Sequence, residues 1–515
     1  MLSLATLLED SARRFPDRVA IVAEGHRWTY AELDAAANRI AVKLTPLGLS
    51  AGDRVALTSP NGAAFTAAHF GVIKAGLVTV PLNILLTERE IGYHLDDSGA
   101  RAYICHADTA ELPLARTGSA AFVQAPGCAH FIALAADGSP GGDSEPGPDE
   151  SGFQTRQTSE TDTAIVFYTS GTTGRPKGAE LTHSNLVQNA LIYGRIFEVT
   201  PQDVFFVGVP LPHVGGLSLV LHTAIAAGAS LVLVPRYRPA QALELMRDER
   251  VTVFHGVPTM YQTLLEAAES SPEHARCADE VSESLRLALV GGAPPAPKLI
   301  EDFEQRFHVR LMDGYGLSET TPVVAINRPG LPPRAGSVGT PIWGVEVSIR
   351  SVGGGVVAAG TPGEVMVRGH NVMKGYLGRP DATQAAIDPD GWFHTGDIGQ
   401  LDADGYLTIL GREKDVIIRG GFNVYPREIE EVLLTHPGII QAAVVGVPHR
   451  THGEEIQAFV VPASGAALTE QELIDWCRTT MAAYKYPRII EFRDLLPTNA
   501  VGKVSKADLL ASAPK

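Results

Sequence analysis

Residues 165–183 read IVFYTSGTTGRPKGAELTH, and this stretch is the most informative part of the sequence. An apolar strand runs into a loop of glycine, serine and threonine that closes at Lys177, and a helix is predicted from Thr182. Glycines let backbone N–H groups turn towards an anion, hydroxyl groups add donors, and the lysine adds positive charge. The pattern predicts a phosphate-binding loop in an α/β domain. It is not a Walker loop, because that motif requires GxxxxGK[ST] and Gly178 follows the lysine.

The rest of the chain extends this α/β pattern. Apolar strand-like runs alternate with helical patterns over most of the 515 residues, which is typical of layered, mostly parallel sheets. Beyond about residue 338 short strands with glycine turns predict a small β subdomain, and an α+β stretch follows Arg412. Residues 137–152, rich in glycine, proline and acids, are expected to form a solvated connector.

Charge and composition exclude several classes of partner. The chain has 42 Lys+Arg against 58 Asp+Glu, a net charge of −16, and this argues against binding to nucleic acid or to an anionic membrane surface. Residues 204–235 contain no charged side chain, but prolines and glycines divide them into a strand, a loop, a short helix and a second strand. We therefore expect no integral membrane segment. The N-terminus has no basic segment of a secretory signal, and the four separated cysteines suit a reducing cytoplasm.

Taken together, the motifs of this chain resemble those of the adenylate-forming superfamily, which includes acyl-CoA synthetases, luciferases and the adenylation domains of peptide synthetases. Residues 168–178 match that family's YTSGTTGxPKG loop throughout, and the likeness extends over about residues 4–503. The resemblance implies an N-terminal adenylation domain of layered α/β sheets at residues 1–411, a hinge at 412–416, and a small mobile α+β domain at 417–515. In such a loop ATP phosphates contact the following residues: Thr169, Ser170, Gly171, Thr172, Thr173, Gly174 and Lys177.

A second motif, DGYGLSET, occupies residues 313–320. On the residues alone a tight turn accounts for it equally well. The resemblance implies that Tyr315 stacks on adenine, Ser318 contacts the α-phosphate and Glu319 holds Mg²⁺; most relatives have threonine where Ser318 stands. It further implies nucleotide contacts from Asp313, Gly314 and Gly316, and from Gly291, Gly292 and Ala293 in the upstream segment LVGGAP.

Two more motifs lie near the predicted hinge, GWFHTGDIG at residues 391–399 and GREKD at 411–415. A carboxylate can accept hydrogen bonds from both hydroxyls of a ribose, which suits Asp397. The resemblance assigns Arg412 to the same sugar, Ile409 to the nucleotide pocket and Lys414 to the hinge itself.

The last motif, LPTNAVGKVSK at residues 496–506, resembles the family's LPxTxxGKxxR ending. It implies that Lys503 is the catalytic lysine, although Asn499 and Lys506 depart from the usual residues. The glycines Gly420 and Gly421 of GGFNVYP would line a tunnel for the thiol arm of coenzyme A.

These assignments imply a two-step ligation. A carboxylate attacks the α-phosphate of MgATP, giving acyl-AMP and pyrophosphate, and a thiol then displaces AMP. The catalytic groups would be Lys503, Thr173, Lys177 and Glu319. The expected co-substrates are ATP and coenzyme A, with Mg²⁺. A fatty acyl-AMP ligase that loads a carrier protein and a catalytically inactive nucleotide-binding relative are the alternatives. A homodimer is left open.

The class of acid substrate is inferred from the residues that line the predicted pocket, which are mostly small and apolar. Malonate-specific relatives place arginine immediately before the YG dipeptide, where this chain has Gly314. We expect a medium-to-long-chain fatty acid, and the alternative is an aryl acid of the coumarate type. The predicted pocket residues are His213, Gly215, Gly216, Gly256, Val257, Gly314 and Leu317.

Overall fold

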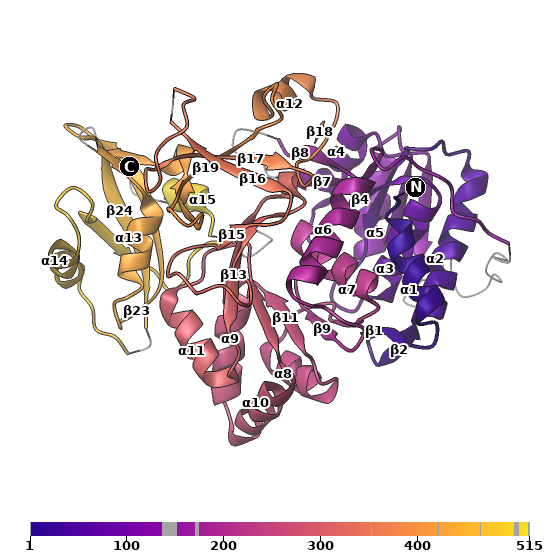
Figure 1. Cartoon of the computed structure of the whole chain (residues 1–515), viewed down its shortest axis with the longest axis horizontal. Helices are drawn as coiled ribbons and strands as arrows, with labels where there is room; N and C mark the ends of the chain where they lie inside the picture. The colour runs from indigo at the N-terminus through magenta and orange to yellow at the C-terminus, as the bar shows by residue number, and fades with distance from the viewer. Residues whose placement is uncertain are drawn as a thin grey trace.

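A computed structural model describes residues 2–135, 152–169, 175–351, 353–419, 422–463, 465–498 and 504–512 of the chain. Four sheets organise these residues (Figure 1). The largest has nine strands in the order β15–β14–β13–β12–β11–β9–β10–β1–β2. In that order their bounds are Thr340–Pro341, Val323–Ile326, Leu311–Gly316, Leu287–Val290, Val253–Gly256, Val204–Val207, Ser230–Leu233, Val19–Ala23 and His26–Thr29.

The second large sheet has seven strands in the order β18–β8–β7–β4–β3–β5–β6. Their bounds are Gly375–Tyr376, Lys177–Thr182, Thr163–Thr169, Val78–Pro81, Arg54–Thr58, Ala102–His106 and His130–Leu134. In both large sheets the central strands pair in parallel, so their carboxyl ends share one edge. One continuous apolar core joins the two sheets. The predicted α/β class is confirmed.

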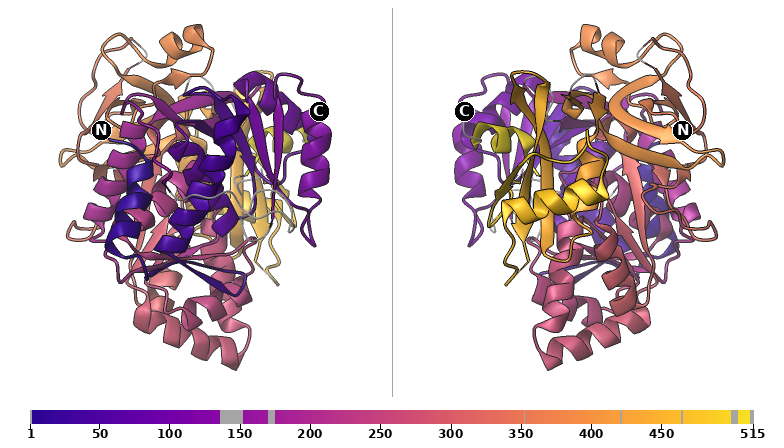
Figure 2. Two further views of the ribbon diagram at one scale, coloured as in Figure 1. Left: turned by 90° about the vertical axis from the view of Figure 1, so that its right-hand side faces the viewer. Right: turned by 90° about the vertical axis from the view of Figure 1, so that its left-hand side faces the viewer.

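Helices cover both large sheets, and their first residues explain where they begin. Threonine side chains at positions 29, 87 and 182 accept hydrogen bonds from backbone N–H groups of the first turn, and proline stands in the first turn of α8–α13. Helices α8–α11 gather as one projecting group (Figure 2). The bounds of α1 to α12 are Ala5–Arg14, Tyr30–Leu44, Ala63–Lys74, Glu88–Ser98, Leu114–Val123, His183–Ile196, His222–Ala227, Pro239–Asp248, Pro258–Glu269, Pro272–Ser284, Pro297–Phe307 and Pro380–Ala386.

The structure tests the expectations for two segments, the residues after the phosphate loop and residues 204–235. Lys177 begins strand β8, which returns antiparallel to β7 before α6 starts, so a strand lies where only a loop was predicted. The uncharged residues 204–235 form β9, a π-helical turn η2 (Gly215–Leu221), α7 and β10, and β9 pairs with β10 in parallel. Within the described part of the chain no helix is long and apolar enough to cross a membrane.

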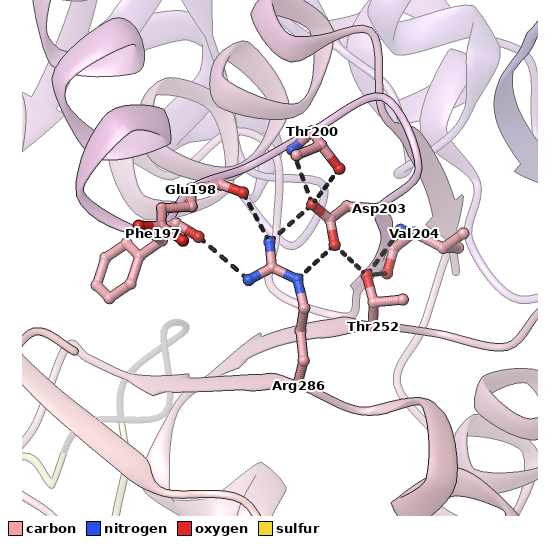
Figure 3. A network of polar contacts seen from close by, with 7 residues as sticks. All are labelled: Phe197, Glu198, Thr200, Asp203, Val204, Thr252 and Arg286. Carbon is pink, nitrogen blue, oxygen red and sulfur yellow. Dashed lines mark hydrogen bonds and ion pairs between the residues drawn. The ribbon is translucent and has the colours of Figure 1, made fainter. Parts of the chain in front are cut away.

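An ion pair fastens the amino ends of three central strands of the nine-stranded sheet (Figure 3). The guanidinium of Arg286 donates from Nε and Nη2 to the two carboxylate oxygens of Asp203, each over 2.7 Å. Thr252 donates to the same carboxylate. Burial alone would raise the pKa of Asp203, but these hydrogen bonds, with that from the N–H of Thr200, lower it instead. The network lies at the sheet edge opposite the carboxyl ends.

The remaining two sheets are built from later residues. The predicted β subdomain is a four-stranded sheet, β16–β17–β19–β20, with bounds Val345–Arg350, Gly363–Gly369, Phe393–Leu401 and Leu407–Arg412. The last sheet has the order β22–β21–β24–β23, with β25 beside β24, and bounds Phe422–Val424, Ile417–Arg419, Gly453–Pro462, Ile439–His449 and Ile489–Phe492. Helices α13 (Pro426–Leu433), α14 (Glu470–Thr480) and α15 (Lys506–Ser512) accompany it.

This C-terminal part has apolar clusters of its own, and Figure 1 shows it at the end of the molecule away from α1–α3. The short helix η4 (Glu413–Asp415) precedes it and carries the exposed Lys414. The hinge and the boundaries at residues 411 and 417 stay predictions.

Candidate active site

The carboxyl ends of the two large sheets bring together segments that are distant in sequence. Strands β12 and β13 end at residues 290 and 316, and β7 of the other sheet ends at Thr169. The Thr169 hydroxyl donates to Oε1 of Glu319 over 3.3 Å, so the two sheet edges meet. Ligands of open α/β sheets bind at this edge, because the loops that follow the strands converge there.

A cavity of about 230 Å³ lies at this edge. Many of the predicted nucleotide residues line it, namely Gly292, Ala293, Asp313, Gly314, Tyr315, Gly316, Asp397, Ile409 and Arg412. They come from the nine-stranded sheet and from the β subdomain, so the structure assembles in one place four segments that are separate in the sequence. Their contacts with a nucleotide stay predictions.

Tyr315, Asp397 and Arg412 form a hydrogen-bonded group inside this cavity. The Tyr315 hydroxyl donates to Oδ2 of Asp397 over 2.5 Å, and Nε of Arg412 donates to Oδ1 over 2.7 Å. Burial, and then the charge of Asp397, raise the pKa of Tyr315 well above its usual value, so the phenol stays protonated and donates. The carboxylate is thus held at the wall of the cavity by two side chains.

Asp313 adds a second carboxyl group to the cavity. Its Oδ1 accepts the N–H of Gly314 over 2.7 Å. Burial raises the pKa of Asp313 to about 7, and the positive charge of Arg427 opposes that rise only partly. The group therefore changes its protonation state close to neutral pH.

Glu319 lies between the cavity and the start of the phosphate loop. Its Oε1 accepts hydrogen bonds from Thr169 and, over 3.0 Å, from the hydroxyl of Tyr376. The Lys177 ammonium lies 5.2 Å from the centre of the Tyr376 ring. A single carboxylate beside a phosphate loop is the type of donor that Mg²⁺ takes together with substrate oxygens, so Glu319 fits the predicted ion. Within the described residues no group of three or more His, Cys, Asp or Glu side chains could hold a metal without a substrate.

The C-terminal part contributes residues to which the sequence motifs assigned no role in the cavity. Arg427 and Glu430 of α13 and Lys506 of α15 line the same cavity. The Lys506 ammonium donates to Oε1 of Glu430 over 2.8 Å. The signal in the sequence was weak, since an arginine at the start of a helix and a lysine near a chain end are usually solvated charges.

Several predicted residues lie elsewhere or outside the described residues. Ser170, Gly171, Thr172, Thr173, Gly174, Gly420, Gly421 and Lys503 lie outside them. Ser318 begins the short helix η3 (Ser318–Thr320), directly after Leu317. Gly291 follows β12, and its N–H donates to the carbonyl of Gly256 over 3.1 Å, which ties the two predicted pocket loops together.

The glycines of the predicted acyl pocket differ in what surrounds them. A Cβ on Gly215 would meet only the ring of His213 within 4 Å, so space is open there. A Cβ on Gly216 would lie 2.3 Å from the carbonyl oxygen of Pro210, and one on Gly256 would contact Tyr261 on the α9 side. Gly216 and Gly256 are therefore explained by packing, and Gly215 alone of the three faces free space.

Comparisons with known proteins identify the family of the chain. A family model described as AMP-binding enzyme matches residues 8–377, and one described as AMP-binding enzyme C-terminal domain matches residues 428–503. Similar curated proteins include a feruloyl-CoA synthase of an Amycolatopsis species, 37% identical over 97% of this chain and 96% of that protein. A long-chain-fatty-acid–CoA ligase of Yersinia pestis is 36% identical over 98% of this chain and 94% of that protein.

Solved structures give the same result. ATP-bound MatB from Rhodopseudomonas palustris superposes with a TM-score of 0.88 at 33% identity, covering 98% of both chains. The anthranilate CoA ligase AuaEII in complex with anthranoyl-AMP gives a TM-score of 0.89 at 27% identity, covering 99% of this chain and 97% of that one. The chain belongs to the AMP-binding enzyme family. This confirms the resemblance to the adenylate-forming superfamily and the prediction of an AMP-forming acid–thiol ligase.

Proposed function

We propose that the protein joins a carboxylic acid to coenzyme A in two steps, through an acyl-AMP intermediate with release of pyrophosphate. The observation that supports this most directly is the single cavity in which Tyr315, Asp397 and Arg412 stand beside the segment leading to Glu319 and Thr169. These groups suit the adenosine half of a nucleotide at one end and its phosphates at the other.

In the first half-reaction the acid's carboxylate oxygen attacks the α-phosphorus, and the bond from that phosphorus to pyrophosphate breaks. A carboxylate is already ionised at pH 7, so no general base is needed. The residues supply position and positive charge, which stabilise the charge that develops in the transition state. We assign that role to Lys177, Lys503 and the donors of the loop, including Thr173. Mg²⁺, held by Glu319 and phosphate oxygens, would supply further positive charge.

In the second half-reaction the thiol of coenzyme A attacks the acyl carbon and AMP leaves with its phosphate. Lys503 would obstruct that approach. We propose that residues 417–515 turn about residues 412–416, with Lys414 at the hinge, and that Gly420 and Gly421 then line the path of the thiol. The reaction needs no membrane or nucleic acid, and we place it in the cytoplasm.

The acid belongs to one of two classes. Relatives at nearly equal identity are named for ferulate and for long-chain fatty acids, so the fatty acid expected from the sequence and the aryl acid kept as its alternative both have support. A carrier-protein thiol and an inactive nucleotide-binding protein are the alternatives to coenzyme A ligation.

The proposal is tested by separating the half-reactions. Pyrophosphate release is measured over fatty and aryl acids, with and without coenzyme A, for the wild type, Lys503→Ala and Lys298→Ala. Lys503→Ala should slow adenylation by about 10²–10³-fold and leave thioester formation from supplied acyl-AMP intact. Lys298, an exposed lysine paired with Asp302, is the control and should behave as wild type. An equal loss of rate in both half-reactions would contradict the assignment of Lys503 to adenylation alone. The absence of pyrophosphate release with every acid would contradict the proposed ligase activity.

A further inference from the structure

A buried histidine–tyrosine pair lies behind the predicted acyl pocket. His255 is the third residue of β11, and its Nδ1 lies 3.4 Å from the hydroxyl of Tyr193 on α6. His255 is 9% exposed and Tyr193 is 2% exposed. The reaction described above uses neither side chain, so the pair needs a separate explanation.

The direction of the histidine follows from strand alternation. The neighbouring Gly256 faces Tyr261 on the α9 side of the sheet, so His255 faces the opposite side, where α6 packs. A Cβ placed on Gly291 would lie 3.7 Å from Nε2 of His255. Because position 291 has no side chain, the edge of the imidazole lies next to the loop that follows β12. Among the described residues Nε2 has no hydrogen-bond partner.

Both members of the pair are neutral at pH 7, and Nε2 is a donor in the tautomer in which Tyr193 donates to Nδ1. Burial, and then the proximity of His213, lower the pKa of His255 to about 4, so the ring is neutral at pH 7. Burial raises the pKa of Tyr193, which therefore stays a phenol whose O–H can donate to Nδ1. A neutral imidazole that accepts at Nδ1 carries its proton at Nε2. In that tautomer the Nε2 proton lies on the side of the ring next to Gly291.

A second polar group stands on the same face of α6. Asn189 precedes Tyr193 by one helical turn and is fully buried, and within the described residues neither polar atom of its side chain has a partner. An alkyl chain beside Gly291 would leave Nε2 of His255 unsatisfied, at a cost of roughly 1–3 kcal/mol. The polar edge of His255 next to Gly291 thus differs from the mostly small and apolar wall expected from the sequence.

We infer that the acid is a hydroxyaryl acid, and that His255 is a specificity-determining residue that hydrogen-bonds its ring hydroxyl while Tyr193 positions the imidazole. The inference rests on the proposed ligase function and narrows its substrate class. A neutral donor suits a hydroxyl oxygen and gives no charge to hold a second carboxylate. An aromatic ring keeps carboxylate and hydroxyl at a constant separation, whereas a hydroxylated alkyl chain would lose rotational freedom on binding.

The test compares matched acids that differ by one hydroxyl. Pyrophosphate release is measured with 4-hydroxycinnamate against cinnamate, and with 12-hydroxydodecanoate against dodecanoate. We expect the wild type to prefer 4-hydroxycinnamate to cinnamate by roughly 10–100-fold in kcat/KM, because the unsubstituted acid leaves Nε2 unpaired. His255→Phe should reduce this preference to less than about threefold, and His255→Asn should restore part of it.

Tyr193→Phe removes one oxygen and tests the positioning role even where His255→Phe lowers the yield of folded protein. It should raise KM for 4-hydroxycinnamate and leave kcat and the use of cinnamate nearly unchanged. Tyr261→Phe is the matched control, because Tyr261 is equally buried but bonds the Phe254 and Leu289 carbonyls on the other face of β11. It should change stability and not selectivity.

Four outcomes would overturn the inference. In the wild type, the inference would fail if kcat/KM were equal for 4-hydroxycinnamate and cinnamate, or higher for dodecanoate than for either cinnamate. It would also fail if the wild type preferred the hydroxylated acid only when comparing 12-hydroxydodecanoate with dodecanoate. Finally, it would fail if the preference for 4-hydroxycinnamate persisted in both His255→Phe and Tyr193→Phe. Failure of the ligase proposal itself would look different, since no acid of any class would then release pyrophosphate.

Discussion

The hydroxyl of Tyr315 donates to the carboxylate of Asp397 over 2.5 Å, joining β13 of the nine-stranded sheet to β19 of the β subdomain. Arg412 holds the other oxygen of the same carboxylate over 2.7 Å. Two different sheets therefore share one anionic group at the wall of the cavity. Since both partners are hydrogen-bond donors, the carboxylate is orientated before any ligand arrives.

Asp397→Asn should raise the KM for ATP by roughly 10–100-fold, because a hydrogen bond to a charged group contributes about 1.5–3 kcal/mol and the amide cannot accept from two directions in the same way. The KM for the acid should change little. Initial-rate kinetics with each substrate varied in turn check this. Asp402→Asn, near the end of the same strand pair and bonded to Arg334 at the surface, is the control and should have nearly wild-type kinetics. An unchanged KM for ATP in Asp397→Asn would remove Asp397 from the nucleotide site.

Adenosine affinity should depend on pH through Asp313. Burial raises its pKa to about 7, and only the ionised carboxylate is purely an acceptor for the amino group of adenine. We expect the Kd for adenosine, measured by calorimetry, to fall several-fold between pH 6 and pH 8 in the wild type, by the usual linkage of binding to ionisation. Adenosine has no phosphate to titrate in that range. Asp313→Asn should give a flat profile, and a profile as steep as that of the wild type would assign the dependence to another group.

Ionisation of the Asp313 carboxyl group should also make the stability of the fold depend on pH, in a direction that its pKa determines. Its folded-state pKa lies above the unfolded value of about 3.9, so its contribution to stability is complete below that value and is lost as the pH rises through about 7. Relative to wild type, Asp313→Asn should therefore gain stability between pH 5 and pH 8. Thermal unfolding at the two pH values measures this difference.

Two adjacent glycines should differ in how much stability they lose on substitution by alanine. Gly216→Ala would bring a Cβ within 2.3 Å of the backbone oxygen of Pro210, and should cost about 1–3 kcal/mol of stability. Gly215→Ala meets only the His213 ring at 3.4 Å and should be nearly neutral. Denaturant unfolding of the two variants compares them directly.

Gly215→Phe extends the same argument to the substrate. The added ring should occupy the open space beside His213 and reduce kcat/KM for bulky acids by about tenfold or more. The kcat/KM for acetate and propionate should not change. Pyrophosphate release over the acid series measures it. An unchanged profile would place the acyl group away from η2.

The Arg286–Asp203 pair should matter for stability and not for catalysis, because it lies at the sheet edge opposite the cavity (Figure 3). Arg286→Leu leaves the buried Asp203 carboxylate without its main partner and should cost about 2–4 kcal/mol at pH 7, with kcat unchanged. The pKa of Asp203 is lowered in the folded state, so this stabilisation is present above about pH 4 and is lost as the pH falls through the folded value.

Urea unfolding of wild type and Arg286→Leu at pH 7 and pH 3 measures the effect, and the difference between the two proteins should shrink at the lower pH. Arg116→Ala removes the exposed partner of Asp108 and is the control, with an expected change below about 0.5 kcal/mol. A loss of stability for Arg286→Leu that does not depend on pH would attribute the effect to packing rather than to the ion pair.

Local sequence was enough to indicate the class of this protein and the segments that build its site. In residues 165–183 the glycine spacing, the hydroxyl groups and a lysine predict a phosphate-binding loop within a few residues. The family resemblance carried by the motifs at residues 313–320, 391–399 and 411–415 assigned Tyr315, Asp397 and Arg412 to one nucleotide site before any contact between them was visible. Local patterning also predicted that the uncharged residues 204–235 form a strand–helix–strand unit.

The residues that share a wall of the cavity although they are distant in sequence are known only from the three-dimensional fold. Arg427 and Lys506 reach the cavity because α13 and α15 pack there, and no local pattern distinguishes them from solvated charges. His255 and Tyr193 meet across 62 residues because the alternation of β11 turns the imidazole towards α6. Burial then makes that imidazole neutral. Such contacts depend on strand register and helix packing, which are properties of the whole core and not of a short segment.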